Sequence, residues 1–130
     1  CDANYFYCHN SDNLNFIVAS LTLQFMEYED RRNLLKNCSK SLTSSGAMVV
    51  VEKIYQETGS DQAMFDVIYQ RTKHSQGLST EDLYNKTQSL AGVLKPYTSE
   101  ENEDMFRDCG FRNIVPFFQL GCFKGWILRI

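Results

Sequence analysis

Two apolar runs decide the fold of this chain: FIVASLTLQF at residues 16–25 and AMVVVEK at residues 47–53. A helix-like stretch joins them, EDRRNLLKNCSKSLTSSG at residues 29–46. A crossover of this length predicts a parallel pair of strands with the helix packed on one face of the sheet. In such sheets the ligand binds beyond the carboxyl ends of the strands, so we expect the chemistry at residues 20–24 and 52–54.

Both of these strand ends also have a plainer interpretation. The TLQF at residues 22–25 can simply end a buried strand, with Gln24 satisfying the backbone of the following loop. Glu52 and Lys53 are expected to form a charged strand end in contact with solvent. On this interpretation neither strand end needs a ligand.

Helical signals account for most of the rest of the chain. Apolar periodicity and capping residues predict four helices, within residues 29–43, 60–77, 79–95 and 98–110. The Ser44-Ser45-Gly46 stretch should end the first helix with a left-handed cap. Thr98 and Glu101 form a capping box for the last helix.

The carboxyl-terminal stretch returns to strand character. NIVPFFQ at residues 113–119 and FKGWILRI at residues 123–130 predict an antiparallel hairpin attached to the sheet edge. Pro116 lacks a backbone N–H, so its strand should be an edge strand or should bulge at that point. The aromatic residues expected to form the hairpin core are Phe117, Phe118, Phe123 and Trp126. Together these elements predict one α/β domain over residues 1–130.

Composition argues against several classes of protein. The formal net charge is −3 and the pI is about 5.3, which argues against strong nucleic-acid binding through a basic surface. No apolar run approaches the roughly 20 residues needed to cross a bilayer, so no membrane association is expected. Five cysteines without CxxC spacing fit a reducing cytosol better than a disulfide framework or a zinc site. We therefore expect a cytoplasmic protein without a metal.

Several short phrases of the sequence are shared with one family of enzymes. They are TLQF at 22–25, EDR-x-x-LL at 29–35, S-G-A-x-V-V-x-EK at 45–53, G-x-S at 77–79, L-x-x-V at 90–93, CGF at 109–111, and FFQ with a following aromatic and glycine at 117–125. The chain resembles the carboxyl-terminal half of class I S-adenosylmethionine-dependent methyltransferases. Within that superfamily it is most similar to the carboxy-S-adenosyl-L-methionine synthase family, which works in tRNA wobble-uridine modification.

The resemblance implies a Rossmann-like fold with parallel strands, a crossover helix, inserted helices and a terminal antiparallel hairpin. It implies S-adenosyl-L-methionine, or its carboxylated derivative, as the cofactor, a small-molecule substrate, and a homodimer formed through the helical region that contains Thr87. The family's glycine-rich loop and ribose-binding acid would lie before Cys1. The chain is therefore expected to be the carboxyl-terminal half of a methyltransferase-like domain that lacks its cofactor-binding amino-terminal half, and to be inactive alone.

The resemblance also implies residues of a site. Asp2 and Ala3 lie about where the family has an Asp-Ile pair that contacts the adenine. Ser20 and Leu21 lie at the end of the strand beside the cofactor, where the family has an Asn in place of Ser20. Thr87 falls where the family has an Arg that reaches across the dimer to the carboxylate of the carboxylated cofactor.

The Thr87 departure bears on the choice of cofactor. A neutral hydroxyl cannot make the bidentate contact of a guanidinium, a loss on the order of 1.5 to 3 kcal/mol for each hydrogen bond to a charged group. Lys86, Lys73 or Arg71 can supply a compensating charge, although a lysine is a point charge without the fork geometry.

Three functions are compatible with these observations. The first is a carboxy-S-adenosylmethionine synthase. The second is an ordinary S-adenosylmethionine-dependent methyltransferase acting on a small molecule or RNA, which Ser20 and Thr87 favour. The third is a non-catalytic dimerising module of the same fold. The sequence has no G-x-S-x-G elbow and no H-E-x-x-H motif. This absence does not distinguish the three functions, because the cofactor of a methyltransferase carries the reactivity.

Overall fold

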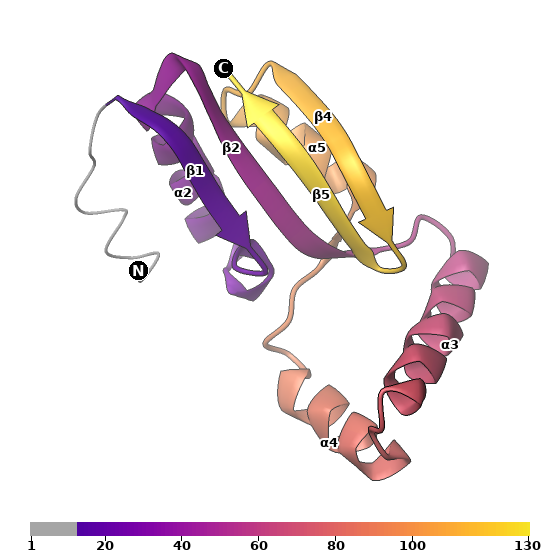
Figure 1. Ribbon diagram of the computed structural model, residues 1–130. Coiled ribbons are helices and arrows are strands. Elements are labelled where there is room, and N and C mark those ends of the chain that lie inside the picture. Colours follow the sequence, from indigo (N-terminus) through magenta and orange to yellow (C-terminus); the bar gives the residue numbers. More distant parts are fainter. Residues whose placement is uncertain (1–12) are drawn as a thin grey trace.

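The computed structural model describes residues 13–130, whose elements are labelled in Figure 1. The strands are β1 (Leu14–Ser20), β2 (Leu42–Tyr55), β3 (Tyr97–Thr98), β4 (Asn113–Leu120) and β5 (Phe123–Arg129). The helices are α2 (Tyr28–Ser41), α3 (Gly59–Ser75), α4 (Thr80–Leu90) and α5 (Ser99–Asp108), with a 3₁₀ turn, η1 (Leu23–Phe25), after β1. The four predicted helices and the predicted hairpin are confirmed.

The sheet has the strand order β1-β2-β5-β4, and the short β3 pairs with the end of β2. Strands β1 and β2 are parallel, with Phe16 opposite Ala47 and Ser20 opposite Val51, and α2 forms the crossover between them. Strands β2, β5 and β4 are antiparallel neighbours. The predicted strand-helix-strand unit and the attachment of the hairpin to it are both confirmed.

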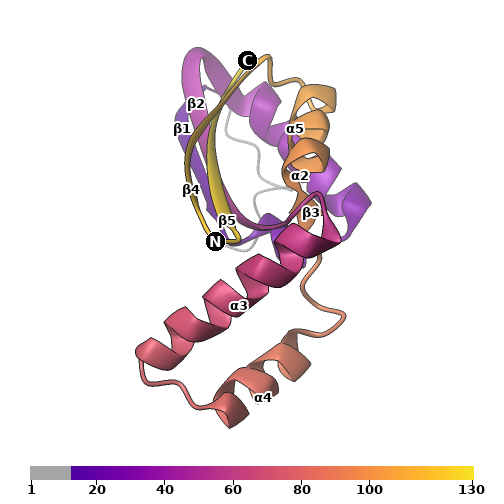
Figure 2. The same cartoon turned by 90° about the vertical axis from the view of Figure 1, so that its right-hand side faces the viewer.

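One face of the sheet carries the core. Figure 2 shows α2 and α5 against this face, whereas α3 and α4 project beyond one end of the sheet. Trp126 and Phe106 are fully buried between the layers, and their rings meet edge to face with centroids 5.5 Å apart. On the opposite face, Phe16 and Val18 of β1 are 62% and 58% exposed. The described residues therefore cover only one side of the sheet at β1.

Several predicted element ends are wrong. The helix expected within residues 79–95 ends at Leu90, and residues 91–93 form a turn. The left-handed cap at residues 44–46 is absent, because α2 ends at Ser41 and the chain continues directly into the extended β2. Gly46 serves a different purpose, since a Cβ there would lie 2.8 Å from the carbonyl oxygen of Leu14 on β1. The apolar run 16–25 is also not one strand: β1 ends at Ser20, and residues 23–25 form the 3₁₀ turn.

The α3–α4 arm, residues 59–90, is built from local signals. Thr58 caps α3, one residue before the helix and two before the predicted start at Ser60. Ser79 caps α4 and forms a capping box with Asp82. No residue of either helix is buried against the rest of the described chain. The predicted apolar face of α3 exists as a sequence pattern, but its Met64 and Ile68 are 51% and 46% exposed.

The hairpin shows what its proline requires. Strand β4, which carries Pro116, is at the edge of the described sheet, and its pairing with β5 shifts register between Pro116 and Phe118. The prediction of an edge strand or a bulge is therefore confirmed on both counts. The predicted aromatic core is only partly correct, because Trp126 is buried while Phe117 and Phe118 are 49% and 37% exposed.

Candidate functional site

The carboxyl ends of β1 and β2 lie together, because the two strands are parallel. Two features occupy this edge of the sheet. One is the loop after β1, residues 20–25, and the other is a cavity between the end of β2 and the α3–α4 arm. Ligands of open α/β sheets bind at this edge.

The loop after β1 is held by the carboxylate of Glu52. Its Oε1 accepts hydrogen bonds from the backbone N–H groups of Thr22 (3.2 Å) and Leu23 (3.0 Å). Its Oε2 accepts one from the N–H of Gln24 at 3.0 Å. Glu52 is 1% exposed, so the prediction of a solvent-exposed strand end is wrong for this residue.

The residues on either side of Glu52 hold the same loop. The carbonyl of Val51 accepts from the N–H of Leu21 at 2.7 Å. The N–H of Lys53 donates to Oε1 of Gln24 at 2.8 Å. The Gln24 side chain therefore accepts from a backbone N–H of β2, whereas one interpretation of the sequence predicted that it would satisfy the backbone of the loop.

Ser20 and Leu21 are presented by this loop. Ser20 is the last residue of β1, is exposed, and accepts a hydrogen bond on its carbonyl from the hydroxyl of Thr22 at 3.0 Å. Leu21 has a positive φ of 51° and a side chain that is 41% exposed. A left-handed conformation costs a residue with a Cβ roughly 1 to 2 kcal/mol, so the loop bonds must hold Leu21 in place.

The electrostatics of this loop follow from burial. Desolvation raises the pKa of Glu52, while the three backbone N–H groups and the nearby Arg31 guanidinium oppose the increase. Arg31 is itself buried, which lowers its pKa, and its guanidinium stacks 4.3 Å from the ring centre of Tyr97. Its Nη2 donates to the carbonyl of Lys95 at 2.9 Å, and the N–H of Lys95 donates to the carbonyl of Gln24. The loop is therefore supported from two sides.

A signal for Glu52 was present in the sequence. Met48, Val50 and Ile54 on β2 are buried, and the two-residue period of a strand puts residue 52 on the same face. The prediction instead followed the general preference of glutamate for solvent. A glutamate at an inward position requires buried donors, which in this chain come from a loop about thirty residues earlier.

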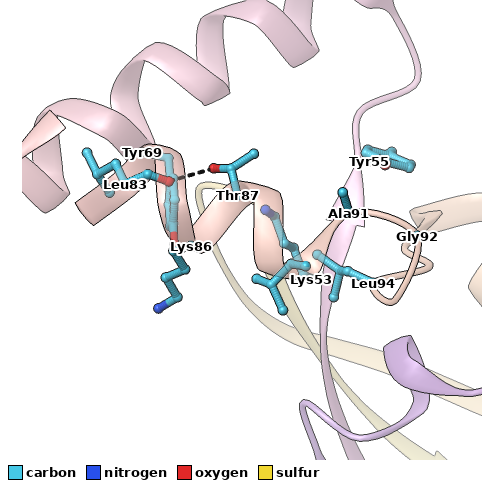
Figure 3. A pocket seen from close by; sticks show the side chains of 10 residues that line it. Lys53, Tyr55, Tyr69, Leu83, Lys86, Thr87, Ala91, Gly92 and Leu94 are labelled. Carbon is cyan, nitrogen blue, oxygen red and sulfur yellow. Dashed lines mark hydrogen bonds between the residues drawn. The ribbon is translucent and has the colours of Figure 1, made fainter. Parts of the chain in front are cut away.

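The cavity at the end of β2 has a volume of about 280 Å³ and is shown in Figure 3. Lys86 and Thr87 line it from α4, Lys53 and Tyr55 from β2, and Tyr69 from α3. The hydroxyl of Thr87 donates to the carbonyl of Leu83 at 2.9 Å, as the dashed line in Figure 3 marks. The cavity is thus lined by two lysines, and the hydroxyl hydrogen of its threonine is already bonded within the helix.

Lys73 lies on a different cavity from Lys86 and Thr87. It lines an apolar cavity of about 240 Å³ between α3 and the end of the hairpin. Tyr69 borders both cavities, with the Nζ atoms of Lys53 and Lys73 lying 5.1 and 5.6 Å from its ring centre. The structure therefore brings Lys86 and Thr87 together with Lys53 and puts Lys73 beyond the Tyr69 ring.

Two predicted site residues and two expected absences are still to be reported. Asp2 and Ala3 are outside the described residues. Within residues 13–130, no group of three or more histidine, cysteine or acidic side chains could hold a metal ion. Across the same residues, no helix is both long enough and apolar enough to cross a bilayer.

No family model matches this chain. The chain is 37% identical over 115 residues to the carboxy-S-adenosyl-L-methionine synthase of Staphylococcus epidermidis. The aligned residues make up 88% of this chain and 50% of that protein. It is 31% identical over 127 residues to the synthase of the same name from Campylobacter jejuni, covering 98% of this chain and 52% of the relative. The chain thus spans about half the length of these curated relatives.

Solved methyltransferase structures share the fold. Human N-acetylserotonin methyltransferase in complex with SAM superimposes with a TM-score of 0.63 at 12% identity, over 95% of this chain and 31% of that one. The structure of PigF with SAH superimposes with a TM-score of 0.61 at 16% identity, over 89% of this chain and 30% of that one. The predicted fold is confirmed as Rossmann-like, of the class I methyltransferase type, and so is the sequence resemblance to carboxy-S-adenosyl-L-methionine synthases.

Proposed function

We propose that this chain is the carboxyl-terminal half of an S-adenosylmethionine-dependent transferase of the carboxy-S-adenosyl-L-methionine synthase type. The observation that carries the proposal is 31–37% identity to synthases of that name along 87–98% of the chain. The loop after β1 supports it, because an exposed strand end held by a buried acid lies at the ligand-binding edge of the fold. The product would serve wobble-uridine modification of tRNA, an indirect role that needs no nucleic-acid surface on this chain.

Ser20 and Leu21 are the cofactor contacts that the described residues offer. The exposed Ser20 hydroxyl suits a polar group of the ligand, and the exposed Leu21 side chain suits the face of an adenine. Asp2 and Ala3 would complete the adenine site. The cofactor supplies an electrophilic sulfonium, while the protein supplies position and electrostatics. Because the chain contributes only one side of that site, we expect it to bind the cofactor weakly by itself.

The cavity beside α4 is the proposed place for an anionic small molecule or a carboxylate. Lys86 and Lys53 line it and can attract an anion, with Thr87 beside them. Lys73 can add to the field from beyond Tyr69 but does not line the same cavity. A lysine can exchange one anion for another more readily than a bidentate arginine can, because it imposes no fork geometry.

A specific observation favours the ordinary methyltransferase as the second candidate. The Thr87 hydroxyl donates to the Leu83 carbonyl, so it has no hydrogen left for a carboxylate. A transferase that uses unmodified S-adenosylmethionine has no need of that contact. Both candidates share the fold and the loop after β1.

The arm is the proposed homodimer surface. Several of its apolar side chains are exposed, including Tyr84 at 63%, and no residue of α3 or α4 is buried in the described chain. A second copy that covers the arm would remove these side chains from water. A non-catalytic module that dimerises through this arm would need the same surface.

We place the protein in the cytoplasm, without a membrane partner.

The test is mass spectrometry of small molecules released by denaturation of the full-length protein that contains this chain. A carboxylated adenosyl cofactor supports the synthase, and plain S-adenosylmethionine or its demethylated product supports the methyltransferase. A protein that is empty and also fails to bind S-adenosylhomocysteine in a titration would leave the non-catalytic module.

A matched pair of variants sharpens the choice between the two enzymes. Thr87→Arg should increase retention of the carboxylated cofactor relative to the plain one if that carboxylate approaches α4. Lys86→Ala should decrease it. If neither change alters the ratio of the two cofactors, the carboxylate does not bind at this cavity.

A further inference from the structure

Glu52 is a buried acid whose carboxylate, among residues 13–130, forms hydrogen bonds only with the backbone of one loop. Three consecutive N–H groups, those of residues 22–24, point at its two oxygens at 3.0–3.2 Å. The side chain is 1% exposed, and none of the ion pairs found among residues 13–130 includes it. Successive N–H groups in a turn form a concave site that favours an anion, and here the protein supplies that anion itself.

We infer that Glu52 is the positioning residue for the cofactor: it fixes the loop that presents Ser20 and Leu21. This inference rests on the proposed function. Glu52 does not touch the cofactor in this assignment. It acts through the geometry of the loop.

The geometry separates this role from ordinary core packing. Three consecutive residues of β2 each bind the loop: Val51 through its carbonyl, Glu52 through its carboxylate and Lys53 through its N–H. Every backbone N–H from residue 21 to residue 24 is thereby used by the end of β2. The shape of the loop is set by the strand end on which a ligand would rest.

The strain at Leu21 explains why such a clamp is needed. Leu21 is left-handed, with a φ of 51°, immediately after the last residue of β1. Without bonds to the three following N–H groups, Leu21 can relax to an extended conformation and move its side chain. The proposed contact residues would then leave the ligand-binding edge.

A glutamine at position 52 tests the charge and the acceptors with little change in volume. Its amide offers one oxygen to the three N–H groups, and its NH₂ group faces a backbone donor where Glu52 offers an oxygen. The loop would lose at least one bond and the negative charge. Burying an N–H without a partner should weaken cofactor binding by about tenfold.

The experiment is calorimetric titration of the full-length protein with S-adenosylhomocysteine, comparing wild type with Glu52→Gln. We expect the Kd to rise by about tenfold at unchanged stoichiometry. The control is Phe106→Leu, a core change against Trp126 at a residue that makes none of the hydrogen bonds of the loop. It should lower stability and the folded fraction, which the stoichiometry reports, while its Kd stays within about twofold.

A second variant covers the case in which Glu52→Gln does not fold. Gln24→Met keeps the volume of a buried side chain but removes the acceptor of the Lys53 N–H, and should raise the Kd by about threefold or more. Wild-type Kd values in these variants would overturn the inference and leave the proposed function standing. Failure of the wild-type protein to bind would overturn both.

Discussion

The sheet layer and the α3–α4 arm are held together in different ways. At the sheet edge, side chains bond to residues far away in sequence, as Glu52 does to Leu23 and Gln24 does to Lys53, 29 positions apart in each case. In the arm, side chains bond to residues three or four positions away, as Gln62 does to Asp66 and Thr87 does to Leu83. Burial favours hydrogen-bonded partners for polar groups, and the Glu52 carboxylate and the Gln24 side-chain oxygen both have them. The arm has helix caps, but none of the residues of its two helices is buried within the described chain.

The largest expected contrast is between Trp126 and Tyr84. Trp126 is fully buried against Phe106, and its Nε1 donates to Glu103 at 2.9 Å. Trp126→Ala should lower the free energy of unfolding by about 3 to 5 kcal/mol. Tyr84→Ala in the arm should change that of the monomer by less than about 0.5 kcal/mol. Urea denaturation followed by far-UV circular dichroism measures both, and equal effects would erase the distinction between core and arm.

Replacing either of two glycines by alanine should change the free energy of unfolding in opposite directions. A Cβ at Gly46 would lie 2.8 Å from the Leu14 carbonyl oxygen and 3.1 Å from that of Thr43, so Gly46→Ala should cost about 1 to 3 kcal/mol by forcing β1 and β2 apart. A Cβ at Gly59, at the start of α3, meets nothing within 4 Å. Gly59→Ala should therefore leave stability unchanged or raise it by up to about 1 kcal/mol. Destabilisation by both alanines would show that the arm is packed after all.

The Glu103 carboxylate gives a smaller effect that depends on pH. Partial burial works to raise its pKa, but the N–H of Trp126 and the ammonium of Lys124 together lower it below the ordinary 4.5. A lowered pKa in the folded state means that the ionised group adds stability above about pH 4.5, and that this is lost as the pH falls through the folded pKa. Glu103→Gln should cost about 1 kcal/mol at neutral pH.

The pH profile of that difference is the test. The stability gap between wild type and Glu103→Gln should narrow as the pH falls below 4.5, because the wild-type carboxylate becomes neutral. Glu81→Gln on the exposed start of α4 serves as the control and should change stability by less than about 0.5 kcal/mol. A gap that stays constant with pH would mean that Glu103 acts through its shape alone.

A charge on the exposed side of α3 should have the smallest effect on the stability of the monomer and the largest effect on its self-association. Val67 on α3 is 49% exposed and makes the arm apolar without supporting its fold. Val67→Asp should change monomer stability by less than about 0.5 kcal/mol but weaken self-association, since a charge would be buried at the dimer surface. Sedimentation velocity of the full-length protein measures the association. An unchanged dimer would remove the arm from the proposed interface.

Local chemistry made much of this fold predictable. The capping box at Thr98 and the helix start at Ser79 were predictable from the sequence, because a cap involves residues only three positions apart. Pro116 predicted an edge strand or a register shift, because proline has no backbone N–H to donate in any strand. Leu21 and Glu52 were harder to read. The conformation of Leu21 depends on bonds between its loop and the end of β2, and the burial of Glu52 depends on that loop. The two residues are too far apart in the sequence for a local pattern to include both.

The sequence by itself determined the four helices, the terminal hairpin, their order, the parallel pair at the start, and a resemblance strong enough to indicate the fold. It did not indicate β3 or the 3₁₀ turn. The tertiary structure alone decided how the ends of those elements are used. It buried Glu52 beneath the loop after β1, made Gly46 a point of contact between strands, and separated Lys73 from Lys86 and Thr87 across the Tyr69 ring. The physical reason is distance along the chain. Propensities and caps act within a few residues, whereas burial and hydrogen bonding at a site depend on residues that only folding brings together.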